Sequence, residues 1–458
     1  MSSVSHISGT EKRAIASLAS LYALRMLGLF MVLPVMAIAG ADFEGATPQL
    51  LGLAIGAYGL SQALLQIPAG ALSDYFGRKP IIVIGLIIFA LGSFIAANAD
   101  TIYGIILGRF LQGCGAIASA VMALVTDLTR EEHRMKAMAS IGASIGLSFS
   151  VALVLGPVLV NLGGLPLIFI LTGVLALGGI ILVLTLVPTP ARKKHRDGSA
   201  IVSEVFKQLG NGQLWPLNIG IFILHALMVA MFVAIPQQLV QAGLTLDQHA
   251  WIYLPVLLIA FVLMVPFVII AEKKKQMKSI VITALGIMII ALILMSQAMG
   301  VWAWAIALGV FFWAFNIMEA TLPSWLSKVA PAGAKGSAMG IYSTLQFLGA
   351  FAGGLIGGWL NIHFGFEGLF LILAAAVFAW AILVIITPKP AHLNSVRIDI
   401  QNQGGEDDQS SLYLDALINL RGVADAILIA EEQAIYLKVD AGLFDYQQAM
   451  ATVNSVGE

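Results

Sequence analysis

Twelve long apolar runs constrain the fold of this chain more than any other feature. Each is long enough to cross a hydrocarbon core of about 30 Å as a helix, which satisfies its own backbone hydrogen bonds there. Charged residues make up only 11% of the chain and the mean hydropathy is +0.93, whereas soluble domains average about 25% charged residues. The sequence therefore predicts an all-α membrane protein with twelve spans, near residues 14–40, 50–73, 80–99, 101–127, 137–162, 165–187, 214–242, 248–271, 279–299, 301–327, 337–361 and 364–387.

The basic residues between these runs predict the orientation. Lys and Arg mark cytoplasmic loops, and alternate loops contain them, including Lys12, Arg13, Arg78, Lys79, Arg130, Arg134, Lys136, 192–196, 273–275, Lys278, Lys328, Lys335 and Lys389. The remaining loops carry acids instead, namely Asp42, Glu44, Asp100, Asp247 and Glu367. We therefore expect both termini in the cytoplasm, and only Arg25 and Arg109 depart from the pattern.

A polar stretch at 188–213 divides the spans six and six. The halves echo one another, because Met138 and Gly156 in the first are spaced like Met339 and Gly357 in the second. Such duplication is typical of two six-helix bundles related by an axis along the membrane normal, with a substrate path between them. We expect an N-terminal bundle over 1–187, a cytoplasmic linker over 188–213 and a C-terminal bundle over 214–390.

A charged turn at 70–79 lies between the second and third spans. Its members are Gly70, Asp74, Gly77, Arg78 and Lys79. Charges of this kind are costly inside a bilayer, and the glycines permit a tight connection, so the turn is expected at the membrane surface. The arrangement resembles the loop between helices two and three of transporters of the major facilitator superfamily. The resemblance covers about residues 14–390.

Two glycine-rich segments extend the resemblance. The fourth span is similar to the family's fourth-helix motif through Arg109, Gly113 and Gly115, and the fifth is similar to the motif of its drug and proton antiporters through Gly142, Gly146, Gly156 and Pro157. The second match is partial, because residues 158–162 intervene before the glycine pair that usually follows closely. In either role, we expect these glycines to allow close helix packing.

The resemblance implies a conformational latch around the charged turn. Asp74 would lie against the positive N-terminal end of helix eleven, near Gly336 and Ser337, where the helix dipole favours a carboxylate. Arg78 would pair with Asp127. Together they would hold the two halves closed on the cytoplasmic side in the outward-open state. The alternative is a static surface ion pair worth about 0 to 1 kcal/mol.

Four ionisable residues lie inside predicted spans, where an acid or base costs about 2.5 to 3.5 kcal/mol. Arg25, Arg109, His225 and Glu319 fall on helices one, four, seven and ten, which line the central path in the family. Glu319 is the first candidate for proton coupling and His225 the second. The alternatives are a permanent basic partner for Glu319, a structural role for His225, and lipid-facing snorkelling for the arginines.

Polar and aromatic residues of the second half are candidates to line a path for a partly apolar substrate. They are Asn218, Gln237, Trp313, Asn316 and Tyr342. Simple packing within the bundle is the alternative for each of them.

Residues 391–458 have the composition of a small soluble domain. From 392 onward, three basic residues stand against eleven acidic ones, a net charge of −8, while the preceding residues carry +7. Residue patterns predict a β-α-β-β-α unit, which resembles ferredoxin-like domains of the heavy-metal-associated type. The Cys-x-x-Cys of that type is absent, so no metal site is expected. We expect the acidic domain to dock on basic segments 192–196 or 273–275, the alternative being an independent domain.

These features together predict a secondary active transporter of the bacterial inner membrane, a proton-coupled exporter of small, partly apolar molecules that works by alternating access. A proton-coupled uptake symporter and a membrane sensor that uses the C-terminal domain are the alternatives. No nucleotide-binding loop or catalytic constellation indicates an enzyme or a cofactor, and the single Cys114 excludes an intramolecular disulfide. The expected partners are a small-molecule substrate, protons and the lipid bilayer, with no nucleic acid.

Overall fold

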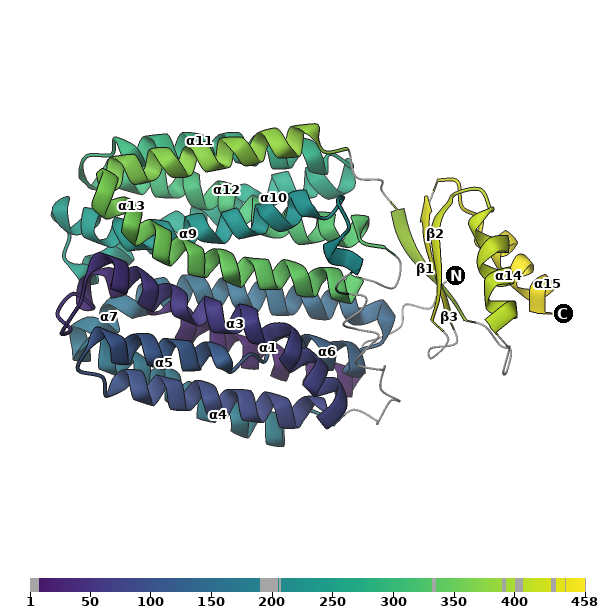
Figure 1. Ribbon diagram of the computed structural model, residues 1–458, viewed down its shortest axis with the longest axis horizontal. Helices are drawn as coiled ribbons and strands as arrows, with labels where there is room; N and C mark the ends of the chain where they lie inside the picture. Colours follow the sequence, from purple (N-terminus) through teal and green to yellow (C-terminus); the bar gives the residue numbers. More distant parts are fainter. Residues whose placement is uncertain are drawn as a thin grey trace.

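The computed structural model describes residues 8–189, 205, 207–331, 335–388, 393–399, 407–429, 434–440 and 442–457. A long helical bundle and a small α+β domain follow one another along its long axis (Figure 1). We call the end of the bundle next to the small domain the domain-side end, and the opposite end the far end. Most of the predicted linker, including 192–196, lies outside the described residues.

The bundle consists of two sequential groups of helices, drawn purple to blue and teal to green in Figure 1. The first group contains α1 (Gly9–Phe30), α2 (Met36–Ala39), α3 (Pro48–Phe76), α4 (Arg78–Ala97), α5 (Ile102–Cys114), α6 (Ala118–Leu128) and α7 (Glu131–Thr185). The second contains α9 (Trp215–Gln241), η1 (Leu246–Gln248), α10 (His249–Lys273), α11 (Met277–Ser296), α12 (Gly300–Val329) and α13 (Lys335–Ile386).

The twelve predicted spans are all present in the described residues. Ten apolar helical segments are long enough to cross a membrane. Eight are single spans, whereas α7 and α13 each contain two helices that meet at glycines. Gly164 and Gly365 have φ angles of 69° and 66° at these junctions, in the left-handed region that glycine adopts without steric cost.

Local sequence signals explain where several helices begin. The hydroxyl of Thr47 accepts a hydrogen bond from the backbone N–H of Leu50, and Pro48 occupies the first helical position of α3. The hydroxyl of Thr101 caps α5 in the same way. Gly77 has a φ of 96° and joins the end of α3 directly to the start of α4. The charged turn at 70–79 therefore consists of about the last two turns of α3, the junction at Gly77 and the start of α4.

The two groups of helices pack tightly against each other at the far end. A Cβ atom at Gly52 of α3 would lie 2.1 Å from the carbonyl oxygen of Gly354 of α13, and one at Gly358 would lie 2.7 Å from that of Pro48. A Cβ at Gly56 would lie 2.8 Å from the carbonyl oxygen of Phe351. Backbone therefore meets backbone here, which requires residues without side chains.

The domain-side end differs. A Cβ atom at Gly142 or Gly146 of α7, or at Gly336 or Gly340 of α13, would meet nothing within 4 Å. These glycines of the two groups therefore make no close contact with each other, unlike the glycines at the far end. We interpret this conformation as closed at the far end and open at the domain-side end.

An aromatic layer connects the two groups between these ends. The ring of Phe149 on α7 lies 6.4 Å from that of Phe232 on α9 and 6.0 Å from that of Phe312 on α12, between ring centroids. Phe30 of α1 packs edge-on against Phe149 at 5.0 Å. Since Phe312 lies twelve residues into α12, the layer is about 18 Å from the far end of that helix.

The small domain has the predicted β-α-β-β-α order, with β1 (Leu393–Asp399), α14 (Asp407–Ile418), β2 (Val423–Ile429), β3 (Ala434–Asp440) and α15 (Tyr446–Gly457). Its antiparallel sheet has the order β1-β3-β2, consistent with a ferredoxin-like domain. Ile398, Ile435 and Leu437 pack with Leu417 of α14 and Ala449 of α15. Both helices cover the face of the sheet that points away from the bundle (Figure 1).

Candidate functional site

Three polar side chains meet inside the second group of helices. Gln346 of α13 lies between His225 of α9 and Glu319 of α12: its Nε2 is 2.8 Å from His225 Nε2 and 3.4 Å from Glu319 Oε1. His225 Nε2 is 3.9 Å from Glu319 Oε2. His225 is 10% exposed and Glu319 is 42% exposed. Because an acid facing lipid would be costly and both of its partners lie on neighbouring helices, we assign this exposure to the interior space between the halves.

Residues on the same helix faces extend the cluster. Asn218 precedes His225 by seven residues on α9, Asn316 precedes Glu319 by three on α12, and Tyr342 precedes Gln346 by four on α13, spacings that put each pair on one helix face. Asn218 Oδ1 and Tyr342 Oη are buried without a protein hydrogen-bond partner among the described residues. Three of the predicted path residues therefore share helix faces with the cluster.

The aromatic layer borders the cluster toward the far end. Phe315 of α12 lies 5.9 Å from the ring of His225 and 6.3 Å from that of Phe312, between centroids. Phe312 precedes Glu319 by seven residues, or about 10 Å along the helix. Glu319 and His225 consequently lie on the open, domain-side edge of an apolar barrier.

The two remaining candidates for the central path are placed elsewhere. The indole nitrogen of Trp313 donates to the carbonyl of Leu263 on α10, 3.1 Å away, so its ring packs against that helix. Gln237 Nε2 donates to the carbonyl of Ala37 on α2 at 3.2 Å. This hydrogen bond joins the two groups of helices at the far end, and Gln237 thus contributes to the closed contact.

Arg25 and Arg109 are buried within the first group, at 3% and 1% exposure. Arg25 NH2 donates to Gln62 Oε1 at 2.7 Å and to the carbonyl of Gly115 at 3.0 Å. Arg109 NH1 donates to Gln112 Oε1 at 2.9 Å, and its other nitrogens donate to carbonyls of α3. Neither arginine contacts an acidic side chain in the part of the chain that the structure describes.

Tyr58 connects these arginines to the other half. The guanidinium carbons of Arg25 and Arg109 lie 5.9 and 5.3 Å from the centroid of its ring, within the range of cation–π attraction. The same ring packs against Phe347 of α13 at 6.3 Å, and Phe347 follows Gln346 directly. The structure brings Glu319 and His225 together and brings the two arginines together, and the ring contact of Tyr58 with Phe347 links the two pairs across the halves.

The charged turn forms an ion-pair network centred on Arg78. Arg78 contacts the carboxylate of Asp74 through NH1, and its Nε lies 3.2 Å from Asp127 Oδ2 at the end of α6. NH1 also donates to Ser73 Oγ at 2.7 Å. Lys79 Nζ donates to the carbonyl of Val187, just beyond α7, at 2.6 Å.

The expected approach of Asp74 to the start of α13 is not seen among the described residues. Asp74 pairs with Arg78 of its own half, and a Cβ atom at Gly336 would meet nothing within 4 Å. The ends of the two halves are separated at this side. The contact around Arg78 lies entirely within the first half.

The motif glycines fall into two groups. A Cβ atom at Gly113 would lie 2.2 Å from the carbonyl oxygen of Tyr58, and one at Gly115 would lie 2.4 Å from that of Gly85. A Cβ atom at Gly156 would lie 2.4 Å from the carbonyl oxygen of Met31, and one at Gly70 would lie 3.2 Å from Cβ of Ser119. These positions pack closely, as expected. Gly142 and Gly146 do not pack in this conformation, because the domain-side half of α7 faces the opening. Pro157 lies inside α7 next to Gly156.

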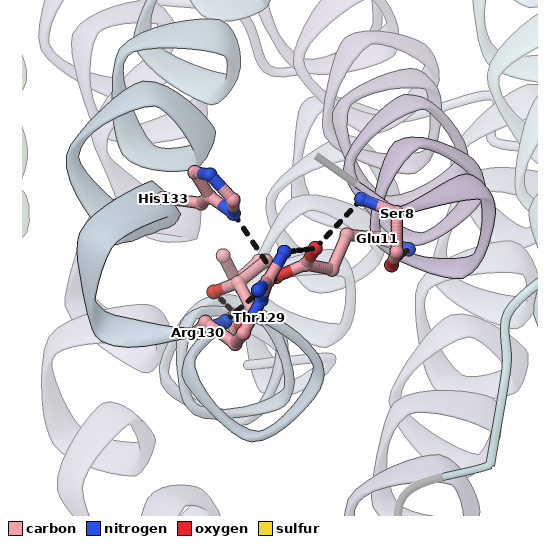
Figure 2. A network of polar contacts seen from close by, with 6 residues as sticks. Ser8, Glu11, Thr129, Arg130 and His133 are labelled. Carbon is pink, nitrogen blue, oxygen red and sulfur yellow. Dashed lines mark hydrogen bonds and ion pairs between the residues drawn. The ribbon is translucent and has the colours of Figure 1, made fainter. Parts of the chain in front are cut away.

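A second polar network, shown in Figure 2, fixes the start of α1 to the start of α7. Glu11 is 5% exposed and accepts hydrogen bonds from the backbone N–H and Nε of Arg130 at 3.0 and 3.2 Å. His133 Nδ1 lies 3.2 Å from Glu11 Oε1. Ser8 and Glu11 also form a capping box at the N-terminus of α1.

Gln346, Tyr58 and the Glu11 network were not predicted from the sequence. Gln346 is an amide within an apolar span, and that signal was visible in the sequence. Glu11 and His133 stand 122 residues apart, and nothing local in the sequence relates them. The capping box was the part of this network that a sequence pattern could indicate.

A family model supports the classification that the geometry suggests. The model of the Major Facilitator Superfamily matches residues 18–354 and 278–404. The chain therefore belongs to the major facilitator superfamily and is a multi-pass membrane transporter. It is 44% identical over 445 residues to the inner membrane transport protein YajR of Escherichia coli K12, covering 96% of this chain and 97% of that protein.

More distant relatives and solved structures agree with this membership. The multidrug resistance protein MdtH of Aeromonas salmonicida is 25% identical over a match that covers 75% of this chain and 86% of that protein. A bacterial homologue of the human lysosomal transporter Spinster, solved in an inward-facing and occupied conformation, has a TM-score of 0.68 at 14% identity and covers 83% of this chain and 98% of its own. A D-xylose-proton symporter has a TM-score of 0.66 at 18% identity, with coverages of 83% and 98%. At these identities the structures show a shared fold.

Proposed function

We propose that this protein is a proton-coupled exporter of small, partly apolar molecules in the bacterial inner membrane. The observation that carries the proposal is the contact of Glu319, Gln346 and His225 at the edge of the opening. An acid that is reachable from one side and bordered by an aromatic barrier toward the other can exchange its proton with one side at a time. That is the requirement for coupling by alternating access.

Three further observations support the proposal. The basic residues and the small domain gather at one end, which we assign to the cytoplasm together with both termini. The structure is then open toward the cytoplasm. Two relatives are named for multidrug and quinolone resistance, MdtH of Aeromonas salmonicida and NorA of Staphylococcus aureus, and their names favour export of partly apolar molecules. The aromatic lining beside Glu319 suits such substrates.

We further propose that the charged turn is a latch of the opposite state. In the present conformation Arg78 holds Asp74 and Asp127 within one half. When the cytoplasmic ends approach, Asp74 would face the N-terminus of α13, where the helix dipole stabilises a carboxylate by about 0.3 to 1 kcal/mol. The open faces of Gly142 and Gly146 would then allow α7 to close against the other half.

The proton-carrying role of Glu319 is tested by Glu319→Gln in reconstituted vesicles with an imposed pH gradient. We expect the variant to insert normally and to lose gradient-driven transport, because the amide cannot release a proton. Glu367→Gln, which removes an exposed acid at the far end, is the matched control and should transport normally. Full gradient-driven transport by Glu319→Gln would transfer the role to His225 or to another group.

The direction of transport is tested with everted vesicles, whose interior is acidified. A substrate added outside these vesicles reaches the cytoplasmic face, so an antiporter would exchange it for internal protons and dissipate the pH gradient. A symporter would leave the gradient unchanged under these conditions and would dissipate it only when the substrate starts inside. Dissipation of the gradient only when the substrate starts inside would show uptake and contradict the proposed export.

A further inference from the structure

Lys438 lies in an unusual position for a lysine. It is on the central strand β3 of the small domain and is 2% exposed. Its neighbours Leu437 and Val439 point into the domain core, so Lys438 lies on the opposite face of the sheet because side chains alternate along a strand. Among the described residues, that face carries no helix of the domain, and it is turned toward the bundle (Figure 1). Lysine is almost never fully buried unless it is paired.

Lys438 contacts the end of α12. Lys438 Nζ donates to the carbonyl oxygen of Ser327 at 3.0 Å and to that of Lys328 at 3.2 Å. Both carbonyls belong to the last turn of α12, whose C=O groups lack partners within the helix. The C-terminal end of a helix also carries the negative end of its dipole and attracts cations. An ammonium group with several donors suits two adjacent carbonyls.

The receiving end of α12 is itself fixed to α10. The carboxylate of Glu272, near the end of α10, contacts the side chains of both Ser324 and Lys328. The side chain of Lys328 is therefore drawn toward Glu272, while its carbonyl accepts from Lys438. The site that Lys438 enters thus belongs to two helices of the second half.

We propose that the helix-free face of the C-terminal sheet is a docking surface for the end of α12, with Lys438 as its anchor. The domain is acidic overall, yet this contact is made by a cation on a helix end. Docking of acidic residues on 192–196, which lie outside the described residues, or on 273–275 stays a prediction. The domain is then part of the second half and moves with it.

The docking places the domain on the helix that carries Glu319. Ser327 follows Glu319 by eight residues, about 12 Å along α12. A change in how the domain sits on α12 would therefore act on the helix of the proposed proton carrier. The docking itself does not depend on the direction of transport or on proton coupling.

Cross-linking in the full-length protein tests the contact. Cys114 is the single cysteine, so Cys114→Ser gives a background for Lys438→Cys with Ser327→Cys, treated with a short bismaleimide. We expect an intramolecular cross-link for this pair. Ser455→Cys with Ser327→Cys is the control, because Ser455 lies exposed on α15, on the other side of the sheet, and should give none.

A second measurement does not require cysteines. Lys438→Met should let trypsin separate the small domain from the bundle about tenfold faster, the size expected from losing charged hydrogen bonds. Arg421→Met removes the same charge from an exposed position of the domain and should leave the rate unchanged. Equal cross-linking of both cysteine pairs, or equal trypsin rates in the two methionine variants, would overturn the proposed docking.

Discussion

Single residues decide whether the interior of this bundle holds a coupling site. Glu319 and His225 were recognisable from the sequence because ionisable groups are rare in apolar spans. Their contact was not recognisable from the sequence, since 94 residues separate them. Gln346, which lies between the two side chains in space, is on a third helix. Packing of three helices creates the cluster, and no pattern along one helix reveals it. The same holds for Tyr58, which contacts both buried arginines and Phe347.

Gln346 should position the two ionisable groups relative to each other. We expect Gln346→Leu to lower the initial rate of gradient-driven transport by about fivefold to tenfold, because it removes a donor to the carboxylate and leaves His225 without its amide partner, at about 1 to 1.5 kcal/mol. Gln297→Leu, at an exposed helix end, is the matched control. An unchanged rate in Gln346→Leu would make Glu319 and His225 independent of each other.

At the scale of elements, the sequence predicted most of what the structure contains. Apolar runs located the spans because a membrane-spanning helix must be apolar throughout its length, and the β-α-β-β-α order of the last domain followed from its periodicities. Gly77 marked the connection between α3 and α4. The break between α5 and α6 at Gly115 and the contact of Lys438 with α12 depend on tertiary packing, which hydropathy does not record.

The connection between α3, α4 and α6 depends on Arg78. Arg78→Ala removes the ion pairs to Asp74 and Asp127 together with the hydrogen bond to Ser73, so we expect transport to fall while the protein still inserts. Lys136→Ala, which removes an exposed base at the same end, should transport normally. If Asp127→Asn lowers transport equally and the double variant lowers it no further, the pair acts as a unit. Normal rates in every variant would reduce the turn to a topology signal.

For the whole molecule, the distribution of contacts between the halves defines the conformation. Backbone contacts between α3 and α13 close the far end, the aromatic layer around Phe149 fills the middle, and glycines of α7 and α13 face open space at the domain-side end. The two ends of a rocking transporter close alternately. The opposite state should therefore separate Gly52 from Gly354 and bring Gly142 and Gly146 of α7 into contact with the second half.

Gly354→Ala should shift this equilibrium toward the opposite state. A Cβ atom at Gly354 would lie 2.3 Å from the carbonyl oxygen of Gly52, and overpacking of this kind costs about 1 to 3 kcal/mol, enough for about a tenfold change in population. Spin labels at positions 136 and 273, exposed at the domain-side ends of the two halves, should report shorter distances in a Cys114→Ser background. Gly286→Ala is the control, because a Cβ there would meet nothing within 4 Å. A distance distribution that is the same in both variants would show that contact between α3 and α13 does not set the conformation.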